Sequence, residues 1–183
     1  YLAQGEYTNA EEVFYYVRVF DKWNSLSTIG LGQVYRKIGD SDKAIQQFHE
    51  GIQLDPSNSI INSLLANEVK NSKGLEQAIQ TITRSLSYEL NLPSAIQVLA
   101  DLYVESNRIE EALQLYNTAI SGDPLSLGTY LVSIAKAYNR ANDYQSAIDS
   151  YQQAERLGAP VFGVYSGLAP IYQNQGWSDL ALG

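Results

Sequence analysis

Residues 31–56 read LGQVYRKIGDSDKAIQQFHEGIQLDP, and this stretch decides the fold. Its apolar side chains recur at helical spacing in two groups: Leu31, Val34, Tyr35 and Ile38, then Ala44, Ile45, Phe48 and Ile52. Gly39, between the groups, tolerates the left-handed backbone that ends a helix. Pro56 ends the second group, because proline lacks a backbone N–H and restricts the residue before it. The stretch therefore predicts a helix, a tight turn and a second helix.

This unit recurs along the whole chain of 183 residues. One alanine returns at a spacing of 34, with a one-residue slip after the fourth: Ala10, Ala44, Ala78, Ala112, Ala147 and Ala181. Five residues before each alanine stands the expected turn residue: Gly5, Gly39, Lys73, Asn107, Asn142 and Gly176. Neither helix of such a unit is stable alone, so we expect neighbouring units to stack and bury a continuous core.

The spacing of Leu31, Gly32, Tyr35, Gly39, Ala44, Phe48 and Pro56 resembles the tetratricopeptide repeat pattern. The resemblance implies an all-α, right-handed superhelical solenoid of helix–turn–helix repeats. The frame predicts a single array over residues 1–183, made of a half repeat at 1–24, full repeats at 25–58, 59–92, 93–126 and 128–161, and a half repeat at 162–183. The copy at 59–92 departs from the pattern, and we expect it to pack less ideally. Since the chain opens inside a repeat, we expect it to be a piece of a longer protein.

Composition limits the classes of partner. The chain has a net charge of −8 and no block of basic residues, which argues against nucleic acid or an anionic membrane as partner. No apolar run approaches the roughly 20 residues that span a bilayer, so we expect no membrane insertion. Cysteine is absent, which removes disulfides and thiolate metal sites. The compartment stays open.

The sequence offers no local motif for catalysis. The single histidine is His49, and no cysteine or repeated carboxylate pair at ligand spacing accompanies it. Gly-rich phosphate loops are absent as well. We therefore expect no enzyme activity, no catalytic residue, no metal site and no cofactor within these residues.

The resemblance implies that a protein or peptide partner binds in the concave groove lined by the first helix of each repeat, which would make the chain a scaffold or adaptor. The candidate groove residues are Leu26, Ile29, Gln33, Arg36, Lys37, Ile60, Leu64, Asn67, Lys70, Gln97, Asp101, Lys136 and Arg140. Neither the family's carboxylate clamp nor its asparagine ladder fits: Asn67 stands alone at the clamp places, and no asparagine stands at the ladder places. What remains is an apolar stretch edged by cations, which suits an amphipathic helix or a peptide with acidic flanks. The alternative is that these apolar residues pack between adjacent first helices.

A second function of a different class stays open. The opening segment is unusually apolar for a chain end, where an uncovered face is expected to meet something. The chain could be a structural subunit that stacks head to tail through its terminal half repeats. The candidate end-to-end contacts are Val13, Tyr16, Phe20, Trp23 and Trp177. The sequence does not identify the partner or the oligomeric state.

Overall fold

The computed structural model describes residues 6–88, 93–122 and 124–176. Within these ranges every regular element is helical, which confirms the all-α prediction. The helices are α1 (Tyr7–Phe20), α2 (Ser25–Ile38), α3 (Ser41–Leu54), α4 (Ser59–Lys73), α5 (Leu75–Tyr88), α6 (Pro93–Glu105), α7 (Ile109–Gly122), the short 3-10 helix η2 (Pro124–Ser126), α8 (Leu127–Arg140), α9 (Tyr144–Arg156) and α10 (Val161–Asn174). In the expected frame, α1 is a second helix, α10 is a first helix, and the helices between them pair as α2–α3, α4–α5, α6–α7 and α8–α9.

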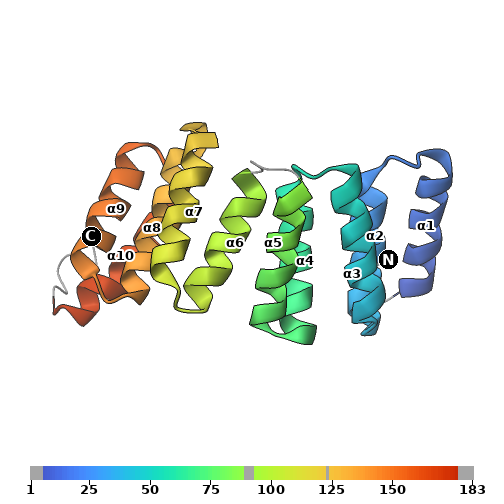
Figure 1. Cartoon of the computed structure of the whole chain (residues 1–183), viewed down its shortest axis with the longest axis horizontal. Coiled ribbons are helices and arrows are strands. Elements are labelled where there is room, and N and C mark those ends of the chain that lie inside the picture. The colour runs from blue at the N-terminus through green and yellow to red at the C-terminus, as the bar shows by residue number, and fades with distance from the viewer. Residues whose placement is uncertain (1–5, 89–92, 123, 177–183) are drawn as a thin grey trace. The chain divides into compact units, whose positions relative to one another are not determined.

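The backbone divides into two compact units, residues 1–98 and 99–183, and the division falls within α6. In the first unit α1 packs on α2, α2 on α3, α3 on α4, and α4 on α5. In the second unit α7 packs on α8, α8 packs on α9, and α10 contacts both α8 and α9. Within each unit, a helix thus packs against its neighbours in the sequence, as a solenoid of repeats requires (Figure 1).

The turn inside a repeat is closed in the same way in three copies. The N–H of the residue after the turn donates to the carbonyl of the repeat tyrosine: Asp40 to Tyr35 at 2.9 Å, Arg108 to Tyr103 at 2.8 Å and Asp143 to Tyr138 at 3.0 Å. The turn residues between them have positive φ: 87° at Gly39 and 62° at both Asn107 and Asn142. Glycine and asparagine are the residues that adopt this conformation at low cost, so the expected turn places are correct here.

The copy at 59–92 differs. Lys73, the expected turn residue, is the last residue of α4, and Gly74 takes the positive φ of 93°. The sequence prediction was therefore wrong by one residue, because the left-handed conformation disfavours lysine and a glycine follows directly. Lys73 instead reaches α3, where its Nζ lies 2.8 Å from a carboxylate oxygen of Asp42.

Asparagine and aspartate side chains fix where several helices begin. The Asn58 side chain accepts from the backbone N–H groups of Ile60 and Ile61 at 3.1 and 3.3 Å, and Asp40 accepts from Lys43 at 3.1 Å. These N-caps satisfy donors that have no partner within the helix. Between α2 and α3 the packing is close enough that a methyl group added at Gly32 would overlap the fully buried ring of Phe48.

Candidate interaction surface

The first unit exposes two large apolar side chains at the same place of consecutive first helices. Leu26 is the second residue of α2 and is 67% exposed, while Ile60 is the second residue of α4 and is 59% exposed. Ile29 and Leu64, the other apolar residues of the predicted stretch, are half-buried. Leu26 and Ile60 are therefore not hidden between adjacent helices, whereas Ile29 and Leu64 are partly covered.

The charges of α2 and α4 are mainly positive. Together the two helices carry Arg36, Lys37, Lys70 and Lys73 against a single carboxylate, Glu68, which is buried. The side chains of Arg36 and Lys37 are exposed near the end of α2, Lys70 is half-buried, and Lys73 pairs with Asp42. Of the polar candidates, Asn67 is exposed and Gln33 is half-buried. This surface is locally basic, although the chain as a whole has a net charge of −8.

Two of the remaining groove candidates, Asp101 and Arg140, form hydrogen bonds within the second unit. The hydroxyl of Tyr116 donates to Asp101 at 2.6 Å, and Arg140 donates to the carbonyl of Val104 at 3.5 Å. Loss of solvation around the Asp101 carboxyl raises its pKa, although the residue as a whole is still exposed. Lys136 is exposed and Gln97 is half-buried. Asp101 and Arg140 thus hold their own unit together.

Two glycines at the sixth place of the repeat frame, counted from 25 and 162, lie directly under an aromatic ring of the preceding helix. A methyl group at Gly30 of α2 would overlap the ring of Phe14 from α1, and one at Gly167 of α10 would overlap the ring and hydroxyl of Tyr151 from α9. The repeat pattern alone does not predict this packing. An aromatic residue 16 positions before a sixth-place glycine is the signal that could have found it.

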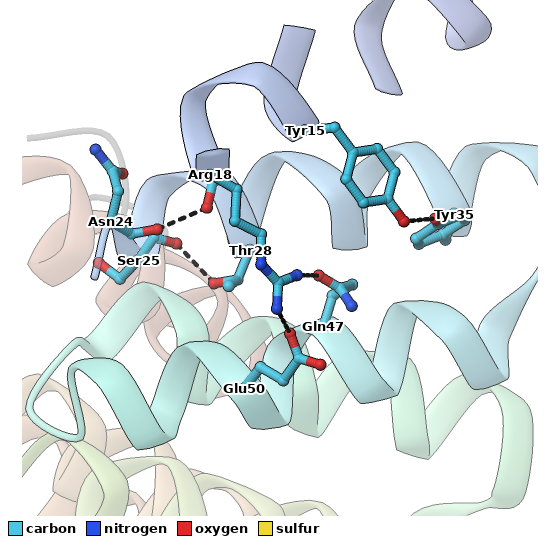
Figure 2. A network of polar contacts seen from close by, with 9 residues as sticks. Tyr15, Arg18, Asn24, Ser25, Thr28, Tyr35, Gln47 and Glu50 are labelled. Carbon is cyan, nitrogen blue, oxygen red and sulfur yellow. Dashed lines mark hydrogen bonds and ion pairs between the residues drawn. The ribbon is translucent and has the colours of Figure 1, made fainter. Parts of the chain in front are cut away.

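A polar network fastens α1 to the first full repeat (Figure 2). The guanidinium of Arg18 donates to Glu50 at 2.6 Å and to Gln47 at 3.1 Å, so α1 reaches past α2 to α3. The hydroxyl of Tyr35 donates to Glu11 at 2.7 Å and lies 3.3 Å from the hydroxyl of Tyr15. Burial and these neighbours raise the pKa of Tyr35, which therefore stays a neutral donor.

The predicted end-to-end residues of α1 are exposed. Val13 is 45% exposed, Tyr16 67%, Phe20 87% and Trp23 82%. Trp177 lies outside the described residues. In α10, Phe162 is 85% and Tyr165 44% exposed.

Among residues 6–88, 93–122 and 124–176, no group of three or more His, Asp or Glu side chains is arranged to hold a metal ion. In that same part of the chain no helix has the length and hydropathy needed to cross a bilayer.

Comparison with known proteins identifies the repeats. Residues 29–58 and residues 98–161 each match a tetratricopeptide repeat family. The curated TPR repeat-containing protein MJ1428 of Methanocaldococcus jannaschii is 25% identical over 91% of this chain. The chain spans 32% of the length of that relative.

Solved structures agree on the fold. A crystal structure of MamA superimposes with a TM-score of 0.60 at 18% identity, covering 83% of this chain and 88% of that one. MamA from Desulfovibrio magneticus RS-1 gives 0.61 at 13% identity, covering 86% and 89%. The Cut9-Hcn1 hetero-tetramer of the APC/C gives 0.65 at 16% identity, covering 96% of this chain and 35% of the other. With the repeat pattern, the closed turns and the matched segments in agreement, the chain belongs to the tetratricopeptide repeat family.

Proposed function

We propose that the chain is a scaffold or adaptor that binds an amphipathic helix or peptide with acidic flanks on the first-helix surface of its first unit. Tetratricopeptide repeats are protein-interaction modules, and this chain is one in that general sense. The observation that carries the finer proposal is the exposure of Leu26 and Ile60 at matching places of α2 and α4.

Chemistry supports the class of partner. Exposed aliphatic side chains at equivalent places of consecutive helices offer contacts to the apolar face of a partner helix. The exposed cations Arg36 and Lys37 near the end of α2 favour acidic residues beside that face, since complementary charge steers association and fixes register. The buried Glu68 offers no competing surface carboxylate on α4. An acidic partner with an apolar stripe therefore suits this surface better than a basic one.

The test uses a labelled amphipathic peptide with leucines at helical spacing and glutamates at both ends, titrated with the chain and followed by fluorescence anisotropy. Leu26→Asp with Ile60→Asp is expected to weaken binding at least roughly tenfold, because each apolar side chain buried in a complex contributes on the order of 1.5–3 kcal/mol. A peptide with lysine ends is expected to bind more weakly than the glutamate peptide. Binding should also fall as salt is added.

Leu125→Asp is the matched control, since Leu125 is 99% exposed but lies in the second unit outside the first helices. Circular dichroism must show unchanged helicity in every variant. If the Leu26 and Ile60 variant binds the glutamate peptide as tightly as the control does, the surface is not the binding site. If the glutamate peptide does not bind the unmodified chain, the proposed class of partner is wrong.

Head-to-tail assembly remains the second candidate function, and one observation favours it. The fourth residue of the repeat frame, counted from 25, 59, 93 and 128, is buried in each full repeat: Thr28 is 1% exposed, Asn62 1%, Ile96 6% and Leu131 8%. Its equivalent in α10, Tyr165, is 44% exposed. In a head-to-tail assembly a second helix from another molecule would cover Tyr165. Substitution of Phe162 and Tyr165 by serine is then expected to abolish assembly, as measured by sedimentation velocity.

A further inference from the structure

An apolar stripe runs along α1 and into the turn that follows it, on the side away from α2. We call Val13, Tyr16, Val19, Phe20 and Trp23 the α1 stripe; their exposed fractions are 45%, 67%, 71%, 87% and 82%. The opposite side of α1 carries the buried Ala10 and the half-buried Phe14, whose ring packs on Gly30 of α2. Each aromatic side chain can bury about 150–250 Å². With three aromatics, the stripe reaches the few hundred Å² that mark interaction sites on soluble proteins.

At two places of the stripe, the equivalent residue is polar in all of α3, α5, α7 and α9, the second helices of the four full repeats. Tyr16 corresponds to Glu50, Arg84, Thr118 and Gln153, and Val19 corresponds to Gln53, Ser87, Ser121 and Arg156. Each of those helices has a preceding repeat in the sequence, so stacking a repeat against this side does not require apolar residues at these two places. The α1 stripe is therefore suited to an occupant other than an ordinary stacked repeat.

The charges at the two ends of the stripe indicate what that occupant is. Glu12 lies beside its beginning, and Lys22 lies two residues after the end of α1, in the turn that follows the C-cap Asp21. Within residues 6–88, 93–122 and 124–176, neither side chain forms an ion pair or a hydrogen bond. In an antiparallel pair of α1 helices, Glu12 of each copy would face Lys22 of the other, and the two helix dipoles would oppose each other favourably. A parallel pair would set like charges side by side.

Competing occupants fit less well. In a head-to-tail contact the stripe would meet α10, and the sequence of α10 contains no charged residue to pair with Glu12 or Lys22. Repulsion between two acidic chains opposes any pairing, but residues 12–23 hold two carboxylates and two cations and so are locally neutral. A shallow hollow lined by Tyr15, Arg18, Val19 and Lys22 lies at the basic end. This hollow could accommodate the part of α1 around Glu12 from another copy of the chain.

From these observations we infer that α1 pairs antiparallel with α1 of a second copy of this chain, which gives a closed two-fold dimer. A contact of this kind is isologous: each copy contributes the same residues, so assembly stops at two. The inference does not depend on the peptide surface of α2 and α4. Because one helix per chain buries less than the about 800 Å² per partner of a standard interface, the dimer is expected to be weak and concentration-dependent.

Sedimentation velocity over about 1–500 μM, the range in which weak contacts are populated, tests the inference. The wild-type chain is expected to shift from monomer to dimer and no further. Tyr16→Gln with Val19→Arg gives α1 the residues found at the same places of α9, so its helix should persist while the dimer weakens at least roughly tenfold. Phe162→Gln, at a site on α10 that is even more exposed than Tyr16 and Val19, is the control and should leave the dimer unchanged.

Charge reversal tests the antiparallel arrangement separately. Glu12→Lys and Lys22→Glu are each expected to weaken the dimer, and the double variant should restore it, because the pair is then reversed but still opposite. A monomer at every concentration would overturn the inference. So would a dimer insensitive to the stripe variant, a double variant weaker than either single one, or open-ended species that disappear with Phe162→Gln. Helicity measured by circular dichroism excludes unfolding as the cause of a loss.

Discussion

Two glycines of α10 allow the packing of a single ring to be measured. A methyl group at Gly167 would overlap the Cζ and hydroxyl of Tyr151, whereas one at Gly163 would lie 3.7 Å from Val132, an ordinary contact. Neither glycine has a positive φ, so alanine can adopt both backbones. Tyr151 is 1% exposed, so its ring is enclosed by neighbouring parts of the protein. Gly163→Ala and Gly167→Ala therefore change the helix propensity of α10 by the same amount, but only Gly167→Ala creates a steric overlap.

The magnitudes follow from these two effects. Replacing glycine by alanine inside a helix gains up to about 1 kcal/mol from propensity. Overlap in a packed core costs about 1–3 kcal/mol. Gly163→Ala is therefore expected to raise the free energy of unfolding by up to about 1 kcal/mol, and Gly167→Ala to be about 1–3 kcal/mol less stable than Gly163→Ala.

Urea unfolding followed by the helical circular dichroism signal measures this difference. Tyr151→Leu in the Gly167→Ala background shortens the overlapping side chain, so the alanine should cost less there than in the background that keeps Tyr151. If Gly167→Ala proves as stable as Gly163→Ala, the ring of Tyr151 does not lie over Gly167. The packing of α9 on α10 described above would then be incorrect.

Two further predictions concern a helix start and a buried hydroxyl. Asn58→Ala removes the cap that accepts from Ile60 and Ile61, and we expect a loss of about 1 kcal/mol in urea unfolding, with the neighbouring exposed Ser59→Ala near neutral. Burial raises the pKa of Tyr151 from 10.0 to about 12, so the unfolded chain loses this proton first and stability falls as the pH rises from about 10 to about 12. Tyr151→Phe should make that fall shallower, and an identical pH dependence in both proteins would contradict the assignment.

The sequence predicted the features that depend on local chemistry. Gly39, Asn107 and Asn142 mark turns because their backbones tolerate positive φ, and the structure has that conformation at all three. Lys73 shows the limit of repeat counting, since a fixed spacing assigns a turn to a lysine although Gly74 beside it is the residue that can form one. The position of that turn is determined by the backbone preference of Gly74 and not by the repeat spacing.

Three-dimensional packing explains what the sequence left open. The repeat frame assigns Gly30 a place on its helix, but whether a ring of the preceding helix fills that place depends on how closely α1 and α2 approach, which spacing alone does not contain. Exposure is a similar case: Leu26 and Ile29 both belong to the predicted apolar stretch, yet Leu26 is exposed and Ile29 is half-buried. Whether these side chains bind a partner is a question for the peptide titration.

The ion pair between Arg18 and Glu50 joins α1 to a helix that is not its sequence neighbour. In an array coupled purely between adjacent elements, the outermost helix can open while the rest stays closed. Here the opening of α1 also breaks the hydrogen bonds that Glu50 and Gln47 of α3 accept from the guanidinium of Arg18. Opening of α1 therefore also destabilises contacts of α3. We therefore expect amide hydrogen exchange to show α1, α2 and α3 opening together as one cooperative group.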